Sequence, residues 1–262
     1  MKVAGLDIGF SVTRRSAGVG LFDGQQVKIK HCYGIDACSL IVRSGRYDIA
    51  AIDGPVVPKG YNINEARAVE RLFCRGLFQK RCKPGMSHIP NTGVRLREEA
   101  GKAADLLFDV LDDPHDTSLF PRVRKGPIIE AFPNAFLGVC LADDVFALMP
   151  SLQRGKKFDW LYEQWRSKHL VEKLLGLTVE ERGLFQTEFD KTGHHEHRAA
   201  LVCILTGLLT ANGYFTAIGD VQGGWFFLPP WSCWKGWAQE TTISRIKELN
   251  QEGAEIQLLR VG

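Results

Sequence analysis

The chain has 262 residues, of which 45% are hydrophobic, and it carries a net charge of +3. It can bury a full-sized core, and no apolar run approaches the roughly 20 residues that span a membrane. The first ten residues predict a strand and not a signal peptide. Seven scattered cysteines without a CxxC pair argue against a disulfide framework or a cysteine zinc cluster. We therefore expect a cytoplasmic protein in a reducing compartment, without a membrane partner.

The first 55 residues predict the order strand, strand, strand, helix, strand. The Asp23-Gly24 step lies between two short strand-like segments, so residues 16–33 are expected to form an antiparallel hairpin. Residues 35–43 predict a helix that Ser44-Gly45 ends. The first strand is expected in VAGLDIG, residues 3–9, and the fourth in YDIAAIDGPV, which contains Asp53.

The remaining elements alternate between helical and extended patterns. Apolar residues at spacings of three and four predict helices between residues 59 and 111, interrupted by the loop KPGMSHIPNTG. Residues 134–212 are expected to be mainly helical, with the clearest helix at about 196–212. We expect further strands at 127–132, in YFTAIGD and in GGWFFLPP, helical segments at about 157–175, and a final helix at about 241–250.

Asp7 and Asp53 are the main candidates for a functional site. Each interrupts an apolar strand, where a charge is costly unless it is paired or bound to a metal. A right-handed crossover would place the fourth strand parallel to the first and next to it, so that both carboxylates meet at the carboxyl ends of the strands, where α/β sheets bind ligands. Converging carboxylates suit Mg²⁺ or Mn²⁺. For either residue alone, a turn or capping role is an equally good interpretation.

Two further acidic positions extend this candidate site. Glu130 lies in the apolar segment PIIEAFP and is a candidate third ligand, with an ion pair to an arginine such as Arg122 or Arg124 as the alternative. At 194–197 the sequence HHEH begins the late helix; we predict Glu196 as the fourth metal ligand and a histidine, His195, as general base or phosphate partner. The alternative for this cluster is a capped, solvated helix start.

The segment from 59 to 97 has nine basic residues against two acids, an excess that the whole chain lacks. Binding to the phosphates of a nucleic acid would explain this excess, and a solvated helix face would explain it equally well. A phosphate loop of the GxxxxGK[ST] type and a GxSxG nucleophile elbow are both absent from the sequence. The candidate nucleic-acid-binding residues are Arg67, Arg71, Arg75, Lys80, Arg81, Arg95 and Arg97.

The motifs GLDIG, IDGPV, IEAFP, the alanine-rich helix after His/Glu, and GGWFFLPP together resemble a known family. It is the family of predicted ribonuclease H-like nucleases called domain of unknown function 429, related to RuvC-like resolvases. The resemblance covers residue 3 to about 230. It implies an α/β fold with a ribonuclease H-like mixed sheet, consisting of a three-strand meander, a crossover helix and parallel strands. The whole chain, 1–262, is then one domain, with a basic helical insertion at 57–126.

The resemblance also implies a nuclease site in which Asp7, Asp53 and Glu130 match the family's acids. The family commonly has an aspartate on the late helix, where this chain has Arg198-Ala199-Ala200, so Glu196 is the nearest acid. We therefore expect a hydrolase that cleaves phosphodiester bonds of DNA or RNA with Mg²⁺ or Mn²⁺ held by Asp7, Asp53, Glu130 and Glu196.

Two alternatives remain open at this point. DIG followed by a glycine-containing hairpin also resembles the first phosphate motif of actin-like kinases and ATPases, although a second meander is not evident in the sequence. The missing helix aspartate fits a nucleic-acid-binding module with a degenerate nuclease core. The sequence leaves the oligomeric state undecided, with a homodimer among the options.

Overall fold

The computed structural model describes residues 1–9, 11, 13–62, 64–82, 85–111, 127–152 and 156–262. It has an α/β architecture built around one mixed sheet. The strands are β1 (Val3–Asp7), β2 (Ala17–Phe22), β3 (Val27–Cys32), β4 (Ile49–Asp53), β5 (Ile128–Ala131), β6 (Phe215–Asp220), β7 (Gly224–Leu228) and β8 (Gln257–Val261). The helices are α1 (Gly34–Ser44), α2 (Ala68–Phe73), α3 (Gly76–Arg81), α4 (Thr92–Phe108), α5 (Pro133–Gly138), α6 (Asp143–Ala147), α7 (Lys156–Ser167), α8 (Val179–Lys191), α9 (His195–Ala211) and α10 (Gly236–Gln251), with 3-10 turns at Leu170–Lys173 and Trp231–Cys233.

The sheet has eight strands in the order β3-β2-β1-β4-β5-β7-β6-β8. β2 runs antiparallel to both β1 and β3, whereas β4 is parallel to β1 and β5 is parallel to β4. β7 continues the parallel set, and β6 and β8 complete the sheet in antiparallel pairs. The predicted hairpin and the predicted parallel neighbour of the first strand are both confirmed.

The hairpin turn shows why the second and third strands pair here. The Asp23 Oδ1 atom accepts hydrogen bonds from the backbone N–H groups of Gln25 and Gln26, both at 3.0 Å. Gly24 adopts a φ of 98°, which residues with a side chain rarely adopt. The Asp-Gly step therefore supplies both the side-chain acceptor and the left-handed conformation that reverse the chain.

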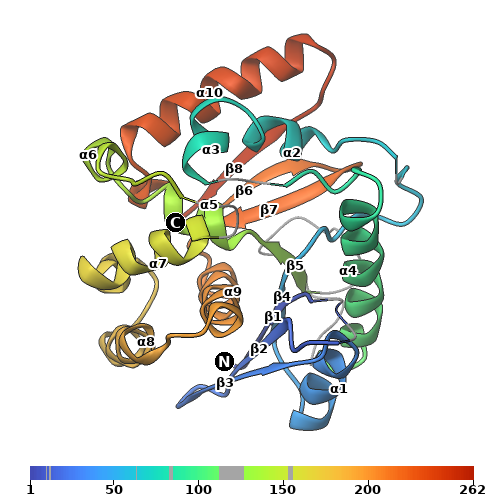
Figure 1. Ribbon diagram of the computed structural model, residues 1–262, viewed down its shortest axis with the longest axis vertical. Helices are drawn as coiled ribbons and strands as arrows, with labels where there is room; N and C mark the ends of the chain where they lie inside the picture. The colour runs from blue at the N-terminus through green and yellow to red at the C-terminus, as the bar shows by residue number, and fades with distance from the viewer. Residues whose placement is uncertain (10, 12, 63, 83–84, 112–126, 153–155) are drawn as a thin grey trace.

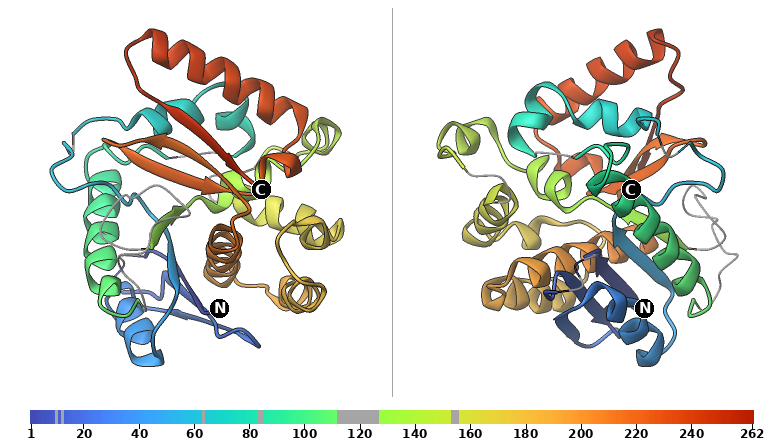
Figure 2. Two further views of the ribbon diagram at one scale, coloured as in Figure 1. Left: turned by 180° about the vertical axis from the view of Figure 1, so that it is seen from behind. Right: turned by 45° about the vertical axis from the view of Figure 1, so that its right-hand side comes forward.

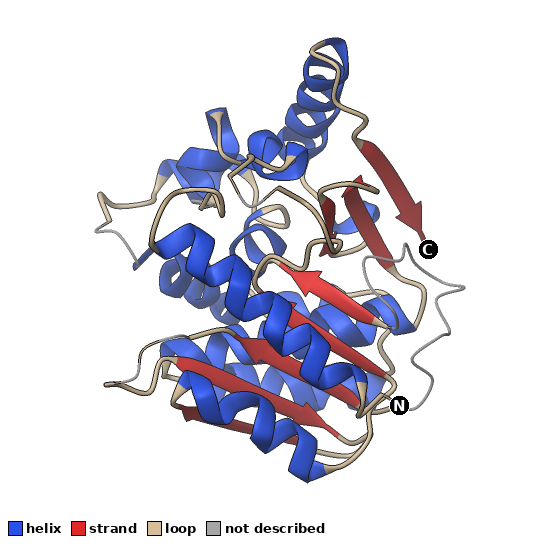
Figure 3. Cartoon of the chain, turned by 90° about the vertical axis from the view of Figure 1, so that its right-hand side faces the viewer, coloured by secondary structure: helices blue, strands red, loops and turns tan. Residues whose placement is uncertain are grey.

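Helices cover the two faces of the sheet differently. α9 lies across β1, β2, β4 and β5 on one face, and α7 and α8 lie beyond it (Figures 1 and 2). α1 and α4 lie on the opposite face, in front of the strands in Figure 3. α10 packs against α2, which in turn contacts β6 (Figure 1). The helices α2, α3 and α4 all fall between β4 and β5 in sequence, so the predicted basic segment connects two strands that pair directly in the sheet.

Most predicted elements are found, with one clear omission. The predicted helices at 35–43, 196–212 and 241–250 correspond to α1, α9 and α10, and the strand at 127–132 corresponds to β5. β8 was not predicted: its residues QLLRV are partly or fully exposed and lack a regular apolar alternation. Across the described part of the chain, none of the helices is long and apolar enough to cross a membrane.

Candidate active site

Asp7 and Asp53 are direct neighbours at the end of two parallel strands. They are paired in register across β1 and β4, and neighbouring strands lie only about 4.8 Å apart. Residues paired in this way point to the same face of the sheet, and here that face carries α9, because Gly5 in β1 touches its backbone. Two carboxylates thus lie side by side at the carboxyl edge, as the crossover predicted.

Glu196 reaches this pair because α9 begins directly above the strands. Gly18 of β2 is the register partner of Asp7, and a Cβ at Gly18 would lie 2.0 Å from the carbonyl oxygen of Glu196. Glycine at this position therefore permits the first turn of α9 to touch the sheet. The charge of Glu196 also helps to raise the pKa of Asp7, after burial and the charge of Asp53. We call Asp7, Asp53 and Glu196 the carboxylate cluster.

The electrostatics of the cluster are unfavourable without a cation. Burial raises the pKa of Asp53 to about 7, and the charge of Glu130 adds to that shift. Burial also raises the pKa of Asp7 well above its usual value, reinforced by Asp53 and then Glu196. Among the described residues, neither aspartate side chain has a hydrogen-bond or ion-pair partner. A bound cation would relieve both the desolvation and the repulsion.

The donor set fits a hard divalent ion with few protein ligands. Mg²⁺ keeps several waters and is commonly bound by only one or two carboxylates together with substrate phosphates. Within the described ranges, no group of three or more His, Cys, Asp or Glu side chains has the geometry to hold a metal ion. The arrangement of Asp7 and Asp53 is therefore consistent with a two-carboxylate site, and not with a closed cage of protein ligands.

Glu130 lies on the other face of the sheet. Its register partner in β4 is Ile52 and not Asp53, so its side chain points away from the face that carries α9. The guanidinium of Arg67 donates to both carboxylate oxygens at 2.7 Å, and the Val56 N–H donates to Oε2 at 3.0 Å. Arg67 comes from the predicted insertion, whereas Arg122 and Arg124 lie outside the described residues. The alternative interpretation of Glu130 as an ion-paired acid is thus the one its contacts support.

A buried network holds Arg67 in place. Its Nε donates to Glu70 at 2.9 Å, and the Ser87 N–H donates to the other Glu70 oxygen at 3.1 Å. Burial alone would lower the pKa of Arg67, but the carboxylates of Glu130 and Glu70 raise it above its usual range. Arg97 donates from Nε to Ser87 Oγ at 3.0 Å. This network ties the segments before α2 and α4 to β5.

The histidines at the start of α9 separate into two environments. His195 Nδ1 lies 3.1 Å from an Asp159 oxygen on α7, on the side away from the sheet. His194 Nδ1 lies 2.8 Å from Glu196 Oε2 and is therefore the histidine next to the carboxylate cluster. Sequence reasoning missed His31 of β3, whose Nδ1 lies 2.9 Å from His197 Nε2. No spacing rule connects positions 166 residues apart, so His31 carried no usable signal.

The basic residues of the insertion do not form one free surface. Arg67 and Arg97 are 1% and 4% exposed and hold the buried network. Arg71 pairs with Glu252, and Arg81 pairs with Asp143 while stacking on Trp237. The candidates whose side chains are exposed are Arg75, Lys80 and Arg95.

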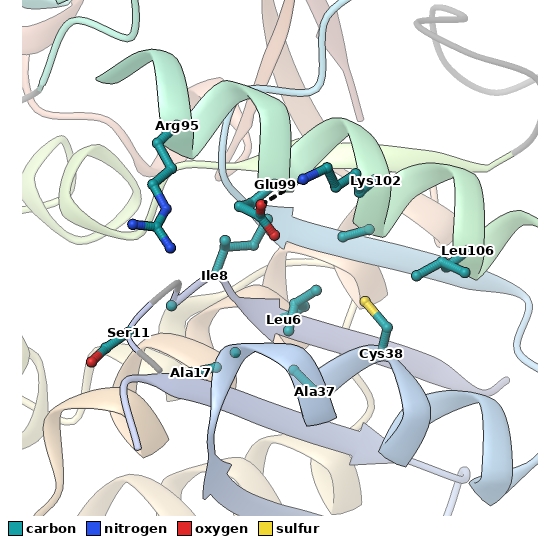
Figure 4. A pocket seen from close by; sticks show the side chains of 13 residues that line it. Leu6, Ile8, Ser11, Ala17, Ala37, Cys38, Arg95, Glu99, Lys102 and Leu106 are labelled. Atoms are coloured by element: carbon teal, nitrogen blue, oxygen red, sulfur yellow. Dashed lines mark hydrogen bonds and ion pairs between the residues drawn. The ribbon is translucent and has the colours of Figure 1, made fainter. Parts of the chain in front are cut away.

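Two cavities flank this edge of the sheet. One, of about 220 Å³, is lined by Asp53, Glu130, Arg67 and Phe132 among others, and we call it the Asp53 pocket. The other, of about 370 Å³, lies between α1 and α4, with Leu6 and Ile8 on its floor. Figure 4 shows Arg95, Glu99 and Lys102 of α4 above that second cavity, with Glu99 and Lys102 paired at 2.8 Å. Only the Asp53 pocket includes a member of the carboxylate cluster.

No protein-family model, curated protein or solved structure matches this chain. What the site can do must therefore be inferred from its own residues. Its distinguishing property is a pair of in-register aspartates at the carboxyl ends of the parallel strands β1 and β4, without an ion-pair partner among the described residues, and with Glu196 at the start of α9 close to them.

Proposed function

We propose that this protein is a divalent-metal-dependent nuclease with a ribonuclease H-like core, which hydrolyses phosphodiester bonds of DNA or RNA. The observation that carries the proposal is the register pairing of Asp7 with Asp53, because it concentrates negative charge where no side-chain cation among the described residues offsets it. Phosphate-bound Mg²⁺ or Mn²⁺ is the partner that such a pair suits best.

The sheet supports the ribonuclease H-like assignment. Its first five strands follow the order β3-β2-β1-β4-β5, with an antiparallel meander and then two parallel additions. This is the arrangement that the resemblance implied for residues 1–132. The three strands that follow extend the sheet, and in the described ranges they do not form a second meander of three consecutive strands, which weighs against an actin-like kinase.

Each member of the cluster has a specific part in the proposal. Asp7 and Asp53 would hold the ion, and Glu196 would accept a hydrogen bond from a water that the ion coordinates. His194 orients Glu196 through their 2.8 Å contact. A bound divalent ion supplies a more acidic water and neutralises charge at the phosphate. Glu130 is left out because its two oxygens already accept hydrogen bonds from Arg67.

The side chain of Arg198 contacts α7 and the residue Thr192. It occupies the region where the family commonly has an aspartate, and its Nε donates to the carbonyl oxygen of Thr192 at 3.1 Å. Its guanidinium contacts Asp159 at 3.2 Å and also Glu163, both on α7. The side chain is therefore committed to helix packing, which leaves Glu196 as the acid of α9 at the cluster.

Cleavage of labelled single-stranded and duplex DNA and RNA, with Mg²⁺, Mn²⁺ or EDTA, tests the proposal. We expect metal-dependent cleavage that Asp7→Asn reduces by at least a hundredfold without unfolding the protein, because the pair loses half of its ion-binding charge. Asp109→Asn is the matched control, since this exposed residue caps α4. Its neighbour Val110 accepts a hydrogen bond from the Tyr47 N–H, before the start of β4, whereas Asp53 ends that strand. Unchanged cleavage by Asp7→Asn would remove the cluster from the reaction. Binding without cleavage would instead indicate a nucleic-acid-binding module.

A further inference from the structure

The Asp53 pocket lies directly beside the proposed scissile phosphate, since Asp53 belongs to both the pocket and the carboxylate cluster. Its volume of about 220 Å³ is below the roughly 300–1,000 Å³ of pockets for drug-sized ligands. A space of this size suits a single flat ring system better than a whole nucleotide.

The walls of the pocket are apolar and partly aromatic. Phe132, at the end of β5, and Phe226 of β7 have ring centroids 4.9 Å apart and tilted by 51°. Phe132 is only partly buried, so part of its ring is available to a ligand. Ile89, which is 50% exposed, stands at the mouth, and Leu96 contributes from α4. Aromatic side chains of this kind stack with unpaired bases.

The charges of the pocket select against a phosphate inside it. Three carboxylates, from Asp53, Glu70 and Glu130, line it against the single guanidinium of Arg67. That guanidinium donates to Glu130, Glu70 and the Gly223 carbonyl oxygen. An anionic group would therefore meet net repulsion, whereas a neutral ring would meet apolar walls and a polar floor.

We propose that the Asp53 pocket receives the base of an unpaired nucleotide whose phosphate lies at the carboxylate cluster. This inference rests on the proposed nuclease function and deepens it by naming the substrate class: single-stranded nucleic acid, or a nucleotide displaced from a duplex. A base inside a continuous helix is stacked and paired, so it cannot enter a pocket without leaving the stack.

Buried hydrogen bonds connect the segments that line the pocket. Glu70 and Ser87 link the start of α2 to the loop before α4, and Arg97 joins that loop to the backbone oxygens of Asn62 and Glu65 at 3.1 Å. Each of these hydrogen bonds involves a buried side chain. A preformed pocket loses less entropy on binding, which favours recognition of one base.

The first test removes the base and leaves the protein unchanged. Oligonucleotides with an abasic site at either of the two nucleotides flanking the cleaved bond are compared with the intact strand. We expect an abasic site at one of these two positions to raise KM about tenfold with little change in kcat, because one stacking contact with the pocket is lost. We also expect single strands to be cleaved at least tenfold faster than a blunt duplex. Equal rates for all these substrates would overturn the proposal.

The second test blocks the pocket. Ile89→Trp fills its mouth, and Leu106→Trp is the matched control, because Leu106 is 57% exposed at the mouth of the larger cavity. We expect Ile89→Trp to raise KM for the intact strand about tenfold and to abolish the abasic penalty, while Leu106→Trp changes neither. If Ile89→Trp fails to fold, the abasic comparison alone decides.

Asp7→Asn separates this inference from the nuclease proposal. If that variant loses cleavage but still binds the intact strand more tightly than the abasic strand, both proposals stand. If it cleaves like the wild type, the nuclease site is wrong. If wild-type protein binds without cleaving and shows an abasic penalty in Kd, only the pocket stands. Absence of any abasic effect in both KM and Kd rejects the pocket.

Discussion

The buried acids on the two faces of the sheet have different partners. On the α9 face, Asp7 and Asp53 repel each other, and no described side chain forms an ion pair with either. On the opposite face, Glu130 is enclosed by Arg67 and the Val56 N–H. All three acids interrupt apolar strands, so the sequence context is the same. The partner on each face, and not the interruption itself, distinguishes the two aspartates from Glu130.

The largest expected effect is a loss of stability when Glu130, on the face opposite α9, loses its partner Arg67. Arg67→Ala leaves Glu130 buried without its cation, so we expect the free energy of unfolding to fall by about 3–5 kcal/mol. Arg71→Ala, which removes a partly exposed ion pair with Glu252, should cost no more than about 1 kcal/mol. Chemical denaturation of both variants measures the difference. Similar losses in the two variants would show that burial does not distinguish these arginines.

On the α9 face, by contrast, we expect removal of a buried acid to increase the free energy of unfolding. Asp53→Asn removes a desolvated charge that is repelled by its neighbours, so the metal-free protein should become more stable, by on the order of 2 kcal/mol at pH 8. Denaturation in EDTA measures this gain. A loss of stability would mean that Asp53 has a favourable partner, and the contrast between the faces would fail.

The pH dependence of stability sharpens the same contrast. Because folding raises the pKa of Asp53 from 3.8 to about 7, the folded state binds more protons between these values than the unfolded state. The stability associated with this group is therefore complete below about pH 4 and is lost as the pH rises through about 7. Melting temperatures in EDTA from pH 4 to 8 should fall more steeply for the wild type than for Asp53→Asn. Parallel curves would contradict the raised pKa.

The smallest effect concerns the histidines. His195 pairs with Asp159 at the surface, so His195→Ala should change the free energy of unfolding by less than about 1 kcal/mol and leave metal-dependent cleavage intact. His194→Ala removes the contact to Glu196 and should weaken Mn²⁺ activation several-fold. Cleavage rates of the two variants, measured over a range of Mn²⁺ concentrations, give this comparison. A larger effect from His195→Ala would restore its predicted catalytic role.

The sequence predicted the Asp7–Asp53 pair because one crossover rule connects two strands 46 positions apart. It could not assign Glu130 to a face, because the register of β5 on β4 depends on pairing across a long insertion, and a shift of one residue reverses every side chain. Counting charges in the insertion likewise could not reveal that Arg67 and Arg97 are buried. Those arginines find acids and carbonyl oxygens that only the folded chain brings together.

A crystal soaked in Mn²⁺ and measured for anomalous scattering tests the central claim most directly. We predict a peak between the carboxylates of Asp7 and Asp53, within ligand distance of both, and its loss in Asp7→Asn. A peak at Glu130, or no peak at this edge of the sheet in the wild type, would contradict the assignment of the uncompensated pair as the metal site.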